Sequence, residues 1–132
     1  MQKIYLTLTI LLSTLIFSSF SYAEWKKVTT HKNGNIDYID PEKIKIYGSS
    51  RFYWVLEDYI IPNDSGVMSM MIYTQAECDL RQTRNLKYAT FELSMGEGAA
   101  KSIWSANDKK WRYVKSRSVS ESNVKFVCSY QK

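Results

Sequence analysis

The sequence predicts an α+β fold, in which a single antiparallel β-sheet of about six strands in a meander has a C-terminal α-helix docked on one face. Two observations lead to this prediction. Residues 25–115 form a series of β-branched and aromatic segments separated by turn residues, and only the last segment has a helical period. A third observation, a pair of cysteines, predicts that a disulfide ties the helix to the sheet.

The first strands are predicted to form a β-hairpin. Residues 25–30 are rich in β-branched and aromatic side chains, and Asn33-Gly34 is a strong signal for a tight turn. Residues 36–40 then alternate between apolar and polar side chains and end at Pro41. Residues 41–46 are expected to be a helical turn or an irregular crossing.

The central strands are expected to be covered at least partly on both sides. In residues 51–61, Phe52, Trp54 and Leu56 share one face, while Tyr53 and Val55 share the other. Turn residues bound each segment. The further strand candidates are residues 67–80, 81–94, 100–105 and 111–115.

The last segment is predicted to be a helix. Ser118 and Glu121 have the spacing of a capping box, in which each side chain satisfies a free backbone donor at a helix start. Val124, Val127 and Cys128 follow at positions i, i+3 and i+4, which gives one apolar face. Cys128 therefore lies on the face that docks on the sheet.

The two cysteines, Cys78 and Cys128, are predicted to form a structural disulfide. An even number of cysteines in an exported chain favours a disulfide, and two cysteines allow one intramolecular pairing. They lie 50 positions apart, so the chain-entropy model gives a stabilisation of roughly 4 kcal/mol. A redox or metal pair would be expected in a C-x-x-C pattern or beside histidines, and neither pattern occurs.

The first 23 residues are predicted to be a signal peptide cleaved after Ala23, which leaves residues 24–132 as one domain. Lys3 precedes an apolar stretch at residues 6–17, and Ser21 and Ala23 provide the small residues of a cleavage site. The alternative is a retained membrane anchor, but threonines and serines interrupt the stretch. No cysteine lies near the site, so no lipid anchor is expected. The mature chain is therefore placed in the periplasm, at the cell surface or in the medium.

The charge of the chain indicates its class of partner. Removal of Lys3 with the leader lowers the net charge from +5 to +4. A positive protein outside the cytoplasm suits anionic partners such as lipopolysaccharide, acidic glycans or acidic proteins. An exported protein rarely meets nucleic acid, so no nucleic-acid partner is expected.

No enzyme, cofactor or metal site is predicted. The single histidine, His31, lies in the predicted hairpin turn, where a solvated side chain is expected rather than a general base. Glu57 and Asp58 are adjacent in a strand, so their side chains point to opposite faces. No zinc-ligand spacing, phosphate-binding loop, nucleophile elbow or dinucleotide motif occurs.

One surface feature remains, the basic–aromatic segment of residues 109–117. In an extended chain five of its side chains would line one face and could bind an anionic glycan or an acidic protein. The alternative, which the base rates for exposed charge favour, is a solvated edge strand whose lysines discourage edge-to-edge pairing, with Trp111 in the core. The segment contains Lys109, Lys110, Trp111, Arg112, Tyr113, Lys115 and Arg117.

A set of motifs occurs in order along the whole predicted mature chain. They are Trp25, Tyr38-Ile39-Asp40-Pro41, Trp54-Val55-Leu56-Glu57-Asp58-Tyr59, Glu77-Cys78-Asp79, the basic stretch Arg81 to Arg84, Tyr88, Gly96-Glu97-Gly98, Trp111 and Cys128. This ordered set resembles the surface-adhesin protein E-like family of small exported bacterial proteins. The resemblance implies an antiparallel sheet, a C-terminal helix tied to it by the disulfide, and formation of a homodimer. It also implies surface adhesion, with binding to host matrix and serum glycoproteins such as vitronectin and laminin.

The functional interpretation is an exported, non-enzymatic binding module of the adhesin type. One alternative is a periplasmic structural or envelope-associated protein with no host contact. Another is a secreted inhibitor, for example of lysozyme. Lysozymes are usually cationic, so the positive net charge counts against the inhibitor.

Overall fold

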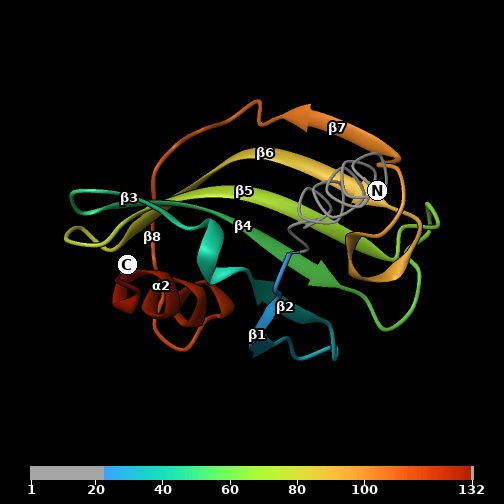
Figure 1. The fold of residues 1–132 in the computed structure, drawn as a ribbon, viewed down its shortest axis with the longest axis horizontal. Helices are drawn as coiled ribbons and strands as arrows, with labels where there is room; N and C mark the ends of the chain where they lie inside the picture. Colours follow the sequence, from blue (N-terminus) through green and yellow to red (C-terminus); the bar gives the residue numbers. More distant parts are fainter. Residues whose placement is uncertain (1–22, 132) are drawn as a thin grey trace, which may run out of the picture.

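The structure, a computed structural model, describes residues 23–131 of the chain and consists of one antiparallel sheet with one α-helix against it (Figure 1). Residues 1–22, almost all of the predicted signal peptide, lie outside the described residues. Two short 3₁₀ turns, η1 and η2, interrupt the strands. The elements are β1 (Lys26–Thr30), β2 (Ile36–Ile39), η1 (Pro41–Lys43), β3 (Lys45–Tyr47), β4 (Ser50–Asp58), β5 (Ser69–Glu77), β6 (Gln82–Phe91), η2 (Ser94–Gly96), β7 (Ser102–Ser105), β8 (Arg112–Tyr113) and α2 (Val119–Ser129).

The sheet follows the predicted meander. Six strands are paired in the order β1-β2-β4-β5-β6-β7, and every pairing is antiparallel. Two short strands lie off this path, since β3 pairs with β4 and β8 pairs with β6. The predicted fold class is therefore confirmed, with β3 and β8 as additions to the six strands.

One local prediction is confirmed and another differs from the structure. Residues 41–46, expected to be a helical turn or an irregular crossing, form the helical turn η1 and the start of β3; the Asp40 carboxylate begins η1 by accepting from the Glu42 N–H at 3.0 Å. In the basic–aromatic segment only Arg112 and Tyr113 are in strand, and Arg117 has a left-handed φ of 61°. A left-handed residue turns the chain, so the segment does not present a single extended face.

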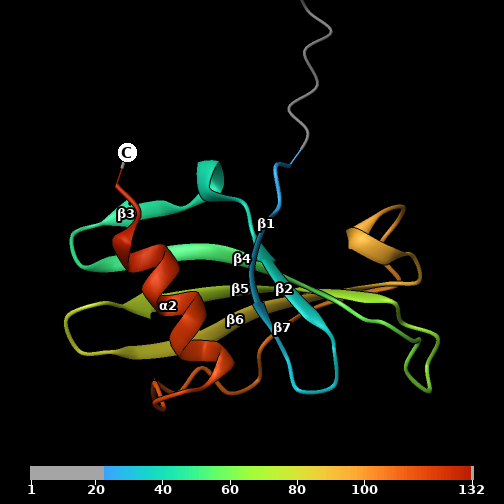
Figure 2. The same cartoon turned by 90° about the horizontal axis from the view of Figure 1, so that it is seen from below.

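The main core lies between the sheet and α2, which crosses one face of the sheet (Figure 2). Tyr53 and Val55 of β4 pack there with Val124 and Val127 of α2. The opposite face is covered in part by η2. Leu56 is fully buried there, and a Cβ at Gly96 would collide with Met71. Coverage of both faces of β4 confirms the prediction from its alternating pattern.

The helix begins at Ser118, whose Oγ accepts from the Glu121 N–H at 3.1 Å. The Glu121 carboxylate accepts from the Arg117 N–H at 3.3 Å instead of closing the capping box on Ser118. Near the other end of α2, Cys128 forms the predicted disulfide with Cys78, which directly follows β5. The disulfide ties the terminal helix to the middle of the sheet.

We expect the double variant Cys78→Ala/Cys128→Ala to lose about 4 kcal/mol of unfolding free energy, because the disulfide closes a loop of 50 residues. Urea denaturation followed by circular dichroism measures this loss. Wild-type protein unfolded with a reducing agent present serves as the control and should match the variant. A loss below about 1 kcal/mol would contradict a stabilising role for the disulfide.

Candidate functional site

A cleft of about 690 Å³ lies between the sheet and the first turns of α2. Strands β4, β5, β6 and β8 form one side, and Ser118, Val119, Ser120 and Asn123 form the other. The floor is apolar at Val55 and Ile72, whereas the rim is polar. An apolar hollow with a few convergent polar groups is the usual form of a binding site.

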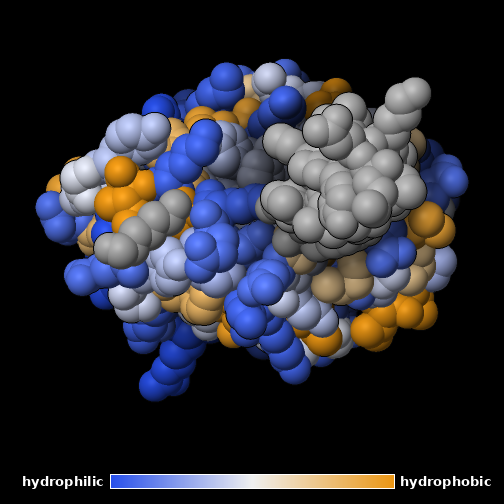
Figure 3. All heavy atoms as spheres, in the orientation of Figure 1, coloured by the Kyte–Doolittle hydropathy of each residue, from blue (hydrophilic) through white to orange (hydrophobic). Residues whose placement is uncertain are grey.

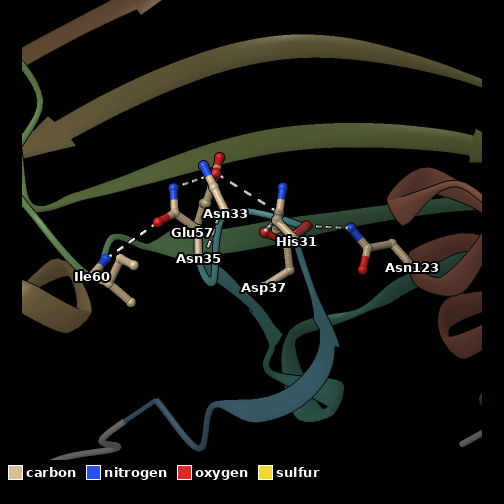
Figure 4. A network of polar contacts seen from close by, with 7 residues as sticks. All are labelled: His31, Asn33, Asn35, Asp37, Glu57, Ile60 and Asn123. Carbon is tan, nitrogen blue, oxygen red and sulfur yellow. Dashed lines mark hydrogen bonds and ion pairs between the residues drawn. The ribbon is translucent and has the colours of Figure 1, made fainter.

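A polar cluster lines one side of this cleft (Figure 4). The His31 Nε2 lies 2.7 Å from Asp37 Oδ1 and 3.8 Å from Glu57 Oε1. The local fold explains why these three side chains lie close together. His31 begins the hairpin turn, in which its N–H donates to the Asn35 carbonyl at 2.7 Å, and Asp37 of β2 pairs directly with Glu57 of β4.

Two asparagines hold the carboxylates of this cluster. Asn123 Nδ2, from α2, donates to Asp37 Oδ2 at 2.8 Å, and Asn35 Nδ2 donates to Glu57 Oε1 at 3.2 Å (Figure 4). The Ile60 N–H in turn donates to Asn35 Oδ1 at 3.2 Å, which fixes that amide. The side-chain amide of an asparagine therefore fixes the orientation of each carboxylate.

The acids make this part of the core electronegative. Asp37 is only 4% exposed. Burial, and secondly the charge of Asp37, raise the pKa of Tyr53 well above its ordinary value. Burial, followed by Glu57 and Asp37, also raises the pKa of Tyr59. Both tyrosines therefore keep their hydroxyl protons at neutral pH.

Sequence reasoning missed this cluster. His31 was expected to be a solvated turn residue, but its side chain is 24% exposed and paired with Asp37. The opposed directions of Glu57 and Asp58 were predicted correctly, because Asp58 accepts from Ser94 Oγ at 2.7 Å in η2 on the other side of the sheet. The one available signal was Asp37, a charged residue within the apolar alternation of β2.

The basic–aromatic segment lies at the edge of the sheet, where β8 pairs with the start of β6. Trp111 is 37% exposed, so the expectation that it packs into the core is wrong. The Arg84 guanidinium lies over the Trp111 ring at 4.5 Å from its centre, and Tyr113 is 77% exposed. Exposed aromatic rings beside cations are characteristic of a contact surface.

Most cations of the basic–aromatic segment are free of local acids. Arg112 pairs with Asp108 at 3.2 Å. Among residues 23–131, no carboxylate lies within ion-pairing distance of the side chains of Lys109, Lys110, Lys115 and Arg117. Because Arg112, Tyr113 and Lys115 also line the cleft, the segment and the cleft form one continuous surface.

On the face seen in Figure 3, hydrophobic residues form separate patches among hydrophilic ones. Scattered patches of this kind are normal on a protein surface and do not by themselves mark an interface. Within residues 23–131, no helix combines the length and the apolar character needed to cross a bilayer.

We expect Asn123→Ala to lower the unfolding free energy by about 1–3 kcal/mol, because the buried Asp37 carboxylate loses a donor. Thermal or urea unfolding measures the loss. Asn107→Ala, at an exposed position outside the cluster, is the matched control and should change stability by less than about 0.5 kcal/mol. Equal effects of the two substitutions would mean that the Asn123 contact contributes nothing.

Comparisons with known proteins agree with this architecture. Crystal form II of Haemophilus influenzae protein E superimposes with a TM-score of 0.61 at 13% identity, covering 86% of this chain and 94% of that chain. The selenomethionine form of H. influenzae protein E gives a TM-score of 0.60 at 14% identity, covering 85% and 92%. No curated protein sequence matches the chain. The sequence profile of the family described as Surface-adhesin protein E matches residues 25–129, and the chain therefore belongs to that family.

Proposed function

We propose that this protein is an exported, non-enzymatic adhesin that contacts host matrix or serum glycoproteins of the vitronectin and laminin type through its basic–aromatic segment. Membership of the Surface-adhesin protein E family supports the adhesin role. The choice of this segment as the contact surface is supported by the exposure of Trp111 and Tyr113. Most of the cations around these two rings have no acidic partner among residues 23–131.

The physical basis of this contact is charge attraction combined with ring packing. Cations without local partners attract acidic protein segments and sulfated or carboxylated glycans, and this attraction speeds association. Exposed aromatic rings contribute apolar area at a low cost in side-chain entropy. Lysines that only protect a sheet edge would not require two exposed aromatic rings beside them.

Two alternatives remain as proposals beside the adhesin. A periplasmic envelope-associated protein would use the same surface on an acidic partner inside the cell envelope. A secreted inhibitor module would need an acidic target, because the predicted mature chain has a net charge of +4. Formation of a homodimer and cleavage of a signal peptide after Ala23 stay predictions.

We expect the triple variant Lys109→Ala/Lys110→Ala/Lys115→Ala to bind immobilised vitronectin or laminin at least about tenfold more weakly, with most of the loss in the association rate. Surface plasmon resonance at two salt concentrations measures both quantities. Lys26→Ala/Lys43→Ala/Lys45→Ala removes the same charge from exposed positions elsewhere and serves as the control. Equal losses in the two triple variants would reduce the effect to net charge and reject the basic–aromatic segment as the contact surface.

The adhesin proposal also requires the protein to be outside the cell. Protease added to intact cells should cleave it while a periplasmic marker stays intact, as detected with an antibody to residues 24–132. Protection until the outer membrane is opened would reject the adhesin and favour the periplasmic alternative. Cleavage of the marker as well would show leaky cells, and the assay would then be repeated with cells grown in an osmotically protective medium.

A further inference from the structure

We propose that His31, Asp37 and Glu57 form a binding site for one divalent transition-metal ion, with Zn²⁺ as the favoured ion. An imidazole and two carboxylates are ligands that Zn²⁺ commonly takes in proteins. The three ligand atoms lie within 4.8 Å of one another, and this is the one group of three such side chains within residues 23–131.

The distances suit a metal with small adjustments. Tetrahedral Zn²⁺ with bonds near 2.1 Å separates its ligand atoms by about 3.4 Å. The His31 Nε2 lies 2.7 Å from Asp37 Oδ1 and 3.8 Å from Glu57 Oε1, so the first separation must lengthen by about 0.7 Å and the second must shorten by about 0.4 Å. Rotations of the His31 and Glu57 side chains, which are 24% and 17% exposed, supply movements of this size.

The charge of the cluster also fits a divalent cation. Asp37 and Glu57 are cross-strand neighbours, and within residues 23–131 His31 is the one cationic partner within ion-pairing distance of either. Two carboxylates with a neutral imidazole carry a charge of −2, which a divalent ion cancels. A protonated imidazole cancels only half of it and leaves a net negative charge beside the core.

The surrounding amides orient the ligands as in a metal site. Asn123 holds Asp37 by its Oδ2 and leaves Oδ1 facing the imidazole. Asn35 holds Glu57, and Asn35 is itself fixed by the Ile60 N–H. Donors that position first-layer carboxylates in this way typically change metal affinity by 10–100-fold when they are removed.

A second, independent observation concerns Asn123, which lines the same cleft and is only 7% exposed. Its Oδ1 is buried and accepts no hydrogen bond from the described residues. The orientation is fixed, because turning the amide around would place Oδ1 against the Asp37 carboxylate. A buried acceptor without a donor is costly, and the Asn123 amide keeps this orientation while its Nδ2 holds the Asp37 carboxylate in place.

Because all three ligands line the cleft, the remaining coordination position of the ion faces that cleft. Three protein ligands and one open position are the arrangement of an exchangeable zinc site, whereas structural zinc sites use four protein ligands. A water molecule completes the coordination in the free protein. Arg112 and Lys115 of the basic–aromatic segment line the same cleft.

Isothermal titration of the untagged exported protein with ZnCl₂ tests this inference. We expect one Zn²⁺ per chain with a dissociation constant in the micromolar range or tighter, and no competition from MgCl₂, which prefers all-oxygen sites. His31→Gln and Glu57→Gln should each weaken binding at least about tenfold. Asp64→Asn removes one carboxylate from an exposed turn and serves as the matched control, with unchanged affinity.

A second readout covers variants that lose stability. ZnCl₂ should raise the melting temperature of the wild type and of Asp64→Asn, but not that of His31→Gln. Absence of Zn²⁺ binding to the wild type at about 1 mM, or equal affinity of wild type and His31→Gln, would overturn the proposal. Neither measurement uses a host ligand, so its failure is separate from any failure of the adhesin proposal.

Discussion

The disulfide between Cys78 and Cys128 determines where α2 lies, and the cleft depends on that position. The helix follows a long turn-rich segment and has two fully or nearly buried apolar residues, Val124 and Val127, to hold it. A covalent bond at its far end restricts the helix to one place on the sheet. With the helix in that place, Asn123 reaches Asp37, which lies 86 residues away in the sequence.

The cluster at the edge of the core reflects the cost of a buried acid. Asp37 is inside the protein because the hairpin register places it opposite Glu57 and under the helix. A buried carboxylate needs partners, and His31 and Asn123 come from opposite ends of the chain to provide them. Such groups add little net stability but define one arrangement of hairpin, strand and helix, since other arrangements leave the charge unpaired.

The sequence predicted features that arise from neighbouring residues. The turn at Asn33-Gly34, the alternation in β4 and the Ser118 cap are local signals, and each appears in the structure. The polar cluster could not be predicted in this way, because it depends on strand register and on contacts between distant segments. Trp111 was misassigned for a similar reason, since its partner Arg84 is on β6 and a hydrophobic residue in an isolated segment is expected to be buried.

The ends of the sheet determine how this protein meets other chains. At one margin β1 contains an irregularity between Lys27 and Thr29, and at the other β7 and β8 have four and two residues. Bulged, lysine-bearing and very short margins give an incoming strand few main-chain groups to pair with. Recognition by strand addition is therefore disfavoured, as is stacking into fibres.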